Sequence, residues 1–141
     1  MLCYELRSPY ASCPMTHPTP GVAFNRYVLV HESVSHWTAE MERLFAEHPE
    51  VVFRWRPYRE ELIGELHLAS LALLTLTPDD ESLSLIQLLK STERSVPISC
   101  LMTQMSVEWE WVARELGADV ILSETTEKGR VAHSLRRLLY L

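Results

Sequence analysis

Glycine is scarce in this chain, with only four among 141 residues. Gly21, Gly64, Gly117 and Gly129 lie far apart, so no loop is rich in glycine. P-loops and dinucleotide-binding fingerprints need clustered glycines, because backbone N–H groups must approach the phosphates closely. The sequence therefore excludes both of these phosphate-binding motifs.

Cysteine is also rare, and its number is odd: Cys3, Cys13 and Cys100. No two of them form a C-x-x-C pair, so the sequence indicates neither a disulfide framework nor a four-ligand zinc site. Cys3, Cys13 and His17 place three soft ligands near the start, but no fourth ligand lies nearby, and we predict no metal there. Cys100 lies inside an apolar run, which is typical of a buried, unreactive thiol.

Long apolar runs are missing as well. Every run falls well short of the roughly 20 residues that cross a bilayer, and the first residues lack the basic and apolar regions of a signal peptide. Thirteen basic residues against nineteen acidic ones leave a net charge of -6, which opposes attraction to nucleic acids and anionic membranes. We therefore expect a cytoplasmic protein that binds no nucleic acid and no membrane.

The residues that are present divide the chain into two parts. Residues 8–21 hold four of the eight prolines and show no periodicity, so we interpret residues 1–25 as a proline-rich N-terminal arm. Residues 26–141 alternate short apolar runs with amphipathic stretches, the pattern of repeated β-α units in one domain. Because the sequence ends with the last predicted helix, we expect a stand-alone domain without an output domain.

Five apolar runs in this domain are predicted strands: 27–30, 51–56, 71–76, 97–102 and 120–122. A helix is predicted after each strand. The first is capped by Ser33 or Ser35, the second spans 59–68 and the third runs from Asp79 to about Ser91. The fourth extends from Ser106 to Gly117, and the fifth covers 127–140. Short strands separated by helices require right-handed crossovers, and these give a parallel sheet with helices on both faces.

Two short motifs carry a resemblance to a known family. Val96-Pro97 opens the fourth predicted strand, and the sequence ELGAD at 115–119 precedes the fifth. With its five β-α units, the stretch 26–141 resembles the receiver domain of bacterial response regulators. The resemblance implies a flavodoxin-like (βα)5 three-layer sandwich with a parallel five-stranded sheet of order 2-1-3-4-5, and a site at the carboxyl ends of the strands.

The same resemblance indicates which residues occupy the phosphorylation site of the family. The acidic pair falls on His31 and Glu32, the nucleophilic aspartate on Thr75 and the lysine on Glu124, while the hydroxyl residue falls one position before Thr103. A threonine hydroxyl is not ionised near pH 7, and a single carboxylate makes a weak Mg²⁺ site. We therefore predict a pseudo-receiver that keeps the scaffold and has lost phosphotransfer, with no catalytic residue and no cofactor.

The aspartates of the chain support this prediction. There are only three, Asp79, Asp80 and Asp119, and none falls on a position where the family needs one. Because the neighbours of Thr75 are not aspartates either, a shift of one residue in the alignment does not restore the nucleophile.

The fourth predicted helix suggests an interaction surface. If Trp109 faces inward, Trp111 lies about 200° around the helix and faces solvent, unless it packs against the following loop. Exposed tryptophan is enriched at interfaces, and the resemblance implies contact through the fourth and fifth helices. The predicted surface comprises Val107, Trp111, Arg130, Arg137 and Tyr140. We predict a signalling adaptor that binds a protein partner or forms a homodimer through these helices.

Two alternatives remain open. The five residues at the former phosphorylation site, His31, Glu32, Thr75, Thr103 and Glu124, could instead hold a small ligand or a metal. An enzyme on the same fold would rest on fold analogy alone, because no nucleophile constellation and no cofactor loop accompany it. We predict no enzymatic activity and no metal.

Overall fold

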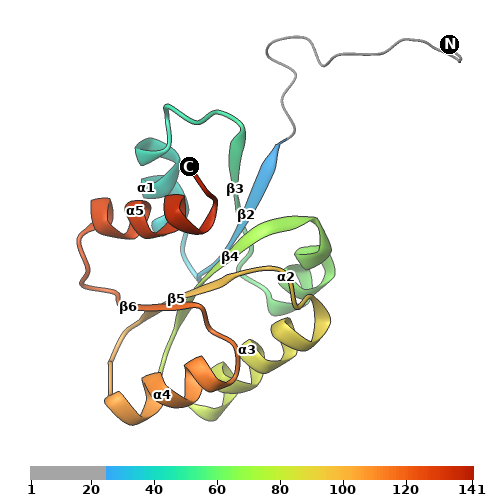
Figure 1. Ribbon diagram of the computed structural model, residues 1–141, viewed down its shortest axis with the longest axis vertical. Coiled ribbons are helices and arrows are strands. Elements are labelled where there is room, and N and C mark those ends of the chain that lie inside the picture. Colours follow the sequence, from blue (N-terminus) through green and yellow to red (C-terminus); the bar gives the residue numbers. More distant parts are fainter. Residues whose placement is uncertain (1–24) are drawn as a thin grey trace, which may run out of the picture.

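The structure is a computed structural model, and it describes residues 25–141. The predicted arm, apart from residue 25, lies outside the described residues, as do Cys3, Cys13 and His17. The described chain forms a sheet that is covered by helices on both sides, so it has three layers (Figure 1).

Five strands form one parallel sheet in the order β3-β2-β4-β5-β6. The strands are β2 (Arg26–His31), β3 (Val51–Trp55), β4 (Ala69–Leu76), β5 (Ile98–Met102) and β6 (Val120–Ser123). Numbered along the chain from the first of these strands, the order is 2-1-3-4-5, which confirms the predicted flavodoxin-like topology. All five strands overlap the predicted runs, and β3 lies at an edge of the sheet as the alternating pattern of its residues indicated.

The helices divide between the two faces (Figure 1). They are α1 (Trp37–Leu44), α2 (Arg59–Glu65) with the 3-10 turn η1 (Leu66–Leu68), α3 (Asp80–Thr92), α4 (Val107–Glu115) and α5 (Lys128–Leu138). Helices α1 and α5 cover one face, whereas α2, α3 and α4 cover the other. This division gives the sheet two separate hydrophobic cores.

The central strand β4 shows why the sheet needs both cores. Leu71 and Leu73 pack on the side of α1 and α5, while Ala72 and Leu74 pack on the opposite side, and all four are fully buried. Successive side chains of a strand point to opposite faces, so a continuous apolar run is the sequence signature of a strand that is covered twice.

The second and first predicted helices differ from the structure. The stretch predicted as one helix, 59–68, is α2 followed by η1, because β4 begins at Ala69, two residues earlier than expected, and the short connection tightens the last turn. The prediction that Ser33 or Ser35 caps the first helix is wrong, since α1 begins at Trp37 and His36 occupies its N-cap position without a side-chain hydrogen bond.

The predicted signals at α3 and α4 agree with the structure. Asp79 is the N-cap residue of α3, where its side chain accepts a hydrogen bond from the backbone N–H of Ser82 at 2.8 Å. Ser106 caps α4 by accepting from the backbone N–H of Trp109 at 3.1 Å. Gly117 follows the end of α4 with a φ of 121°, a conformation that side chains rarely adopt.

Candidate functional site

A pocket of about 390 Å³ lies at the edge of the sheet where the strands end, between the ends of β2 and β4 and the first turns of α2 and α3. We call it the carboxyl-edge pocket. Its lining residues are His31, Pro57, Tyr58, Arg59, Glu60, Thr75, Leu76, Thr77, Glu81, Ser82 and Leu85. Of the five residues predicted to form a pocket here, it brings together only His31 and Thr75.

His31 and Thr75 are joined through the backbone. The hydroxyl of Thr75 donates a hydrogen bond to the carbonyl oxygen of His31 at 2.9 Å. The Nδ1 atom of His31 lies 2.9 Å from the carbonyl oxygen of Arg56, and because a carbonyl only accepts, Nδ1 donates this hydrogen bond. The proton of Thr75 is thus engaged, whereas His31 keeps one ring nitrogen for a ligand.

Glu32 lies next to His31 in the sequence but serves a different part of the molecule. Its side chain is buried, and its Oε1 atom accepts from the backbone N–H of Trp37 at 2.9 Å. Its Oε2 atom accepts from the backbone N–H of Thr38 at 2.8 Å and from the hydroxyl of Thr38 at 2.7 Å. Glu32 therefore caps α1 from outside the helix, where a negative charge is favourable, and does not line the carboxyl-edge pocket.

Thr103 and Glu124 follow β5 and β6, and their backbone N–H groups continue the hydrogen bonding of the sheet. The backbone N–H of Thr103 donates to the carbonyl of Leu76 at 3.1 Å, and that of Glu124 donates to the carbonyl of Met102 at 2.9 Å. Both side chains are exposed, and neither lines the carboxyl-edge pocket. The structure thus separates three of the five predicted pocket residues from the other two.

The prediction missed the residues that α2 and α3 contribute. Arg59 opens α2, and its Nη1 atom lies 3.7 Å from a carboxylate oxygen of Glu81 in the first turn of α3. Tyr58 and Ser82 line the same pocket. The available signal was the start of both helices, because helices that follow parallel strands begin at the carboxyl edge of the sheet.

One carboxyl group near the carboxyl-edge pocket and one thiol in the sheet have shifted pKa values. Hydrogen bonds from the Thr77 hydroxyl and the Ser82 backbone hold the pKa of Asp79 below its ordinary value. Burial raises the pKa of Cys100 to about 12, and the carboxylate of Asp119 adds to the shift. The thiol is fully buried in β5, which confirms the prediction that it is shielded from reaction.

The described residues offer little for a metal ion. Between residues 25 and 141, no group of three or more His, Cys, Asp or Glu side chains is placed so that it could hold one. No helix in this part of the chain is both long enough and apolar enough to span a membrane.

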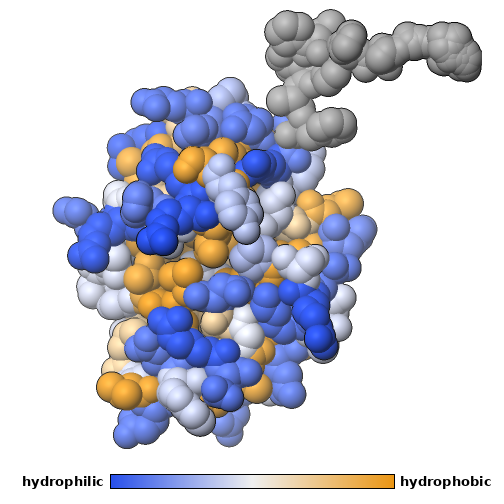
Figure 2. Space-filling view, viewed as in Figure 1, coloured by the Kyte–Doolittle hydropathy of each residue, from blue (hydrophilic) through white to orange (hydrophobic). Residues whose placement is uncertain are grey.

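Helix α4 carries an exposed apolar stripe. Val107 is 82% exposed and Trp111 is 64% exposed, and they are four positions apart, so they lie on the same side of the helix. Figure 2 shows apolar atoms reaching the surface at the lower left, where α4 lies. Trp109 packs partly buried against the core, which confirms that the two tryptophans point in different directions.

The other predicted surface residues lie on α5 or just beyond it. Arg130, Arg137 and Tyr140 are all exposed. Arg137 and Tyr140 line a second pocket at the edge where the strands begin, whereas Val107 opens α4 just beyond the end of β5. Helix α4 covers one face of the sheet and α5 covers the other, and β6 is the edge strand between them.

Comparisons with known proteins agree with this architecture. No protein-family model and no curated protein matches the chain. A response regulator from Thermotoga maritima matches with a TM-score of 0.70 at 12% identity, covering 84% of this chain and 100% of its own. An orphan response regulator of H. pylori matches with 0.69 at 19% identity, covering 81% and 96%.

A CheY-like receiver domain protein from Methanospirillum hungatei matches with a TM-score of 0.70 at 15% identity, covering 84% of this chain and 95% of its own. At such low identities the likeness establishes the fold alone. That fold is the flavodoxin-like fold of response-regulator receiver domains.

Proposed function

We propose that this protein is a receiver-like module of two-component signalling that acts by binding another protein and is not switched by aspartyl phosphorylation. The observation that carries the proposal is Thr75 near the end of the central strand β4, with its hydroxyl donating to the carbonyl of His31. A receiver-like scaffold with threonine at this place can present surfaces to partners, but the end of its central strand offers no carboxylate for phosphorylation. The proposed activity is binding without catalytic turnover.

The electrostatics of the carboxyl edge support this proposal. Acyl phosphate formation needs a carboxylate nucleophile beside Mg²⁺, and Mg²⁺ needs further hard oxygen ligands. The nearest acidic candidate after β2, Glu32, is already engaged by three hydrogen bonds from the start of α1. Glu124 places a negative charge where the receiver family has a lysine, and such a charge repels a phosphoryl group.

A phosphodonor experiment tests the proposal. The protein is incubated with acetyl phosphate and Mg²⁺ beside a receiver domain that is known to be phosphorylated, and both are weighed as intact proteins. We expect the reference domain to gain a phosphoryl group and this protein to gain none. If hydroxylamine removes a phosphoryl group from this protein, the group is an acyl phosphate. If Asp79→Asn or Asp80→Asn prevents this phosphorylation, the phosphorylated aspartate is located and the proposal ends.

We propose that the binding surface includes the apolar stripe on α4. The partner is another protein or a second copy of this chain, which would give a homodimer. Tryptophan side chains supply much of the binding energy at protein interfaces. Helix α4 carries Glu108, Glu110 and Glu115, whereas α5 carries Arg130 and Arg137. Opposite charges on the two helices favour contact between α4 of one molecule and α5 of another, because complementary charges steer association.

A second candidate function is small-ligand binding, and the volume of the carboxyl-edge pocket favours it. About 390 Å³ lies within the ordinary range of roughly 300–1,000 Å³ for ligand pockets. A ligand at 100 times its dissociation constant stabilises the folded state by about 2.7 kcal/mol, so a thermal-shift screen detects it. Tyr58→Ala, inside the pocket, should abolish the shift, and Glu124→Gln, outside it, should not; a flat screen removes this candidate.

A further inference from the structure

A second pocket, of about 420 Å³, lies at the opposite edge of the sheet, where the strands begin. We call it the amino-edge pocket. Its lining residues are Arg26, Ser70, Ser95, Pro97, Asp119, Arg137, Leu138, Leu139 and Tyr140. They come from the starts of β2 and β4, the segments before β5 and β6, and the C-terminal end of α5. The pocket therefore lies at the end of the sheet opposite the carboxyl-edge pocket, and it shares Arg137 with the α5 surface proposed above.

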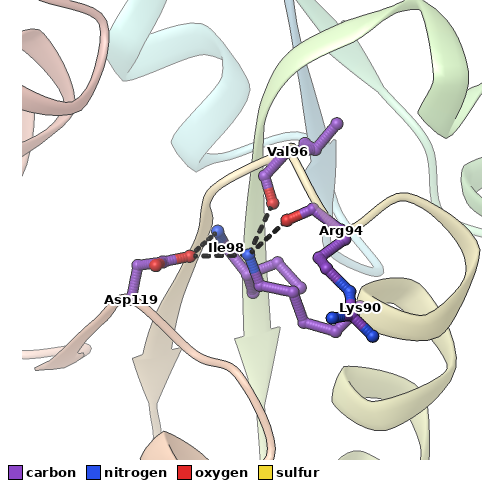
Figure 3. Close-up of polar contacts among 5 residues, drawn as sticks. All are labelled: Lys90, Arg94, Val96, Ile98 and Asp119. Atoms are coloured by element: carbon purple, nitrogen blue, oxygen red, sulfur yellow. Dashed lines mark hydrogen bonds and ion pairs between the residues drawn. The ribbon is translucent and has the colours of Figure 1, made fainter.

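The pocket is basic although the protein as a whole is acidic. Its lining carries two guanidinium groups, those of Arg26 and Arg137, and one carboxylate, that of Asp119. Oδ2 of Asp119 accepts from the backbone N–H of Ile98 at 2.8 Å and lies 3.2 Å from Nζ of Lys90 (Figure 3). Because Lys90 neutralises Asp119, the local charge is positive against a net charge of -6 for the chain.

The two guanidinium groups are free to bind an anion. Within residues 25–141, no carboxylate lies within ion-pair distance of Arg26 or Arg137. A hydrogen bond from Nη1 of Arg26 to the carbonyl of Leu139 fixes that guanidinium beside the pocket, and residues 25–141 supply no side-chain partner to it. Arginine holds phosphate through paired N–H donors, and the hydroxyls of Ser70 and Ser95 add neutral donors at the same site.

Hydrogen bonds occupy the last backbone carbonyls of α5, which lessens their repulsion of an anion. Free carbonyls at the end of a helix carry negative partial charge. Here the carbonyl of Arg137 accepts from the backbone N–H of Tyr140 at 3.2 Å, and that of Arg136 accepts from the N–H of Leu141 at 2.8 Å. The carbonyl of Leu139 accepts from Arg26. These hydrogen bonds form a Schellman motif that satisfies the last turn.

Tyr140 occupies the left-handed position of this motif with a φ of 60°, where glycine is the preferred residue. Its side chain is 92% exposed, so it adds nothing to the core that would offset the strain. A strained backbone that holds an aromatic ring at the mouth of a basic pocket indicates a role for the ring. An aromatic face suits stacking on a planar ring of a ligand.

We propose that the amino-edge pocket binds a small phosphate monoester with a planar ring, namely a nucleoside monophosphate. Arg137 and Arg26 hold the phosphoryl group, and Tyr140 covers the base. The site differs from glycine-rich nucleotide motifs because its donors are side chains. Occupancy would place a metabolite signal at the end of the molecule opposite the carboxyl-edge pocket.

Calorimetric titration tests the proposal with AMP, GMP, inorganic phosphate and adenosine as probes. We expect a nucleoside monophosphate to bind more tightly than phosphate, and adenosine not to bind. Arg137→Met should weaken nucleotide binding by about tenfold or more, since it removes charge-assisted hydrogen bonds. Arg130→Met is the matched control, because it removes the same charge from α5 outside the pocket and should leave binding nearly unchanged.

Tyr140→Leu tests the contribution of the base to binding separately from that of the phosphate. It should weaken binding of the nucleotide and leave binding of inorganic phosphate unchanged, because only the stacked ring is lost. The proposal is overturned if neither nucleotide binds, if Arg130→Met weakens binding as much as Arg137→Met, or if phosphate alone accounts for the affinity. Each of these results is independent of the phosphodonor experiment.

Discussion

At the scale of single residues, Glu32 shows that the direction of a side chain decides which part of the fold it serves. It follows β2 directly, beside His31, yet the two side chains serve different parts of the fold. His31 lines the carboxyl-edge pocket, whereas Glu32 turns to the start of α1 and satisfies two backbone N–H groups there. An acidic residue at a strand end is therefore a structural cap in this protein.

Glu32→Gln should destabilise the protein by about 1–3 kcal/mol. The substitution removes the negative charge at the N-terminus of α1, and an amide cannot accept with both of its ends, so at least one buried donor at the start of α1 loses its partner. Urea unfolding measures the change. Glu124→Gln is the matched control, because Glu124 is exposed, and we expect a change within about 0.5 kcal/mol. Equal effects of the two substitutions would contradict this role of Glu32.

The same residues mark the limit of prediction from sequence. The pattern of apolar runs in the sequence placed His31 and Thr75 correctly at the ends of neighbouring strands. The pattern could not reveal that Glu32 caps a helix five residues away, since N-caps are recognised next to a helix and the serines there were better candidates. It also missed Tyr58 and Arg59 at the start of α2, because the apolar periodicity of a helix marks the face that packs on the core and not the residues of its first turn that line a pocket.

At the scale of elements, Lys90 joins α3 to the starts of β5 and β6 (Figure 3). Its Nζ atom donates to the carbonyls of Val96 at 3.0 Å and Arg94 at 3.3 Å, and it pairs with Asp119 at 3.2 Å. Gly117 lies against the same side chain, since a Cβ at that position would be 2.2 Å from Cγ of Lys90. The sequence ELGAD thus has a packing role at this edge of the sheet.

Gly117→Ala should destabilise the protein by about 1–3 kcal/mol, because it adds strain at a φ of 121° and forces Lys90 to move. In a Lys90→Ala background the same substitution should cost less, since the clash is gone and only the backbone strain remains. Gly129→Ala in α5 is the control: open space surrounds its Cβ position, and we expect a gain of up to about 1 kcal/mol. Additive effects of Gly117→Ala and Lys90→Ala would exclude the contact.

The elements themselves could be predicted well because their signals are local. The runs at β4 and β5 are apolar throughout, which is typical of strands covered on both faces, and Ser106 and Gly117 mark both ends of α4. The tightened turn at Leu66–Leu68 was missed because Leu66 continues the apolar side formed by Leu62 and Ile63 in the helix before it. Whether such a segment is a helix or a 3-10 turn depends on where the next strand begins.

Trp111→Ala should weaken association with a protein partner or a second copy by more than about 1 kcal/mol while leaving the melting temperature nearly unchanged. The reason is its exposure, since an exposed side chain contributes little to folding. Analytical ultracentrifugation and pulldown from the source cells measure the association. Leu88→Ala on α3 is the control, because it removes another exposed apolar side chain from the same face of the sheet. Unchanged association after Trp111→Ala would remove α4 from the interface.

At the scale of the whole molecule, the sheet lies between two cores, and Cys100 in β5 is sealed beneath α3 and α4. Burial raises the pKa of its thiol from 9.0 to about 12. Between these pH values the unfolded state releases a proton that the folded state keeps, so the free energy of unfolding should fall by about 1.4 kcal/mol per pH unit. Denaturation at pH 9 to 11 measures this slope, which should be shallower in Cys100→Ala; equal slopes would contradict the shifted pKa.

The buried thiol also reports on the cooperativity of the fold. In a variant with Cys3→Ser and Cys13→Ser, Cys100 is the only thiol of the chain. Because the sheet joins the two cores, we expect the core around Cys100 to open only when the whole domain unfolds, and iodoacetamide at pH 8 should label Cys100 at a rate that follows global unfolding. Each 1.4 kcal/mol of destabilisation should then raise the rate about tenfold, so Glu32→Gln should accelerate labelling and Glu124→Gln should not. Rapid labelling that ignores both substitutions would mean that β5 opens locally, and the two cores would then be separate units of stability.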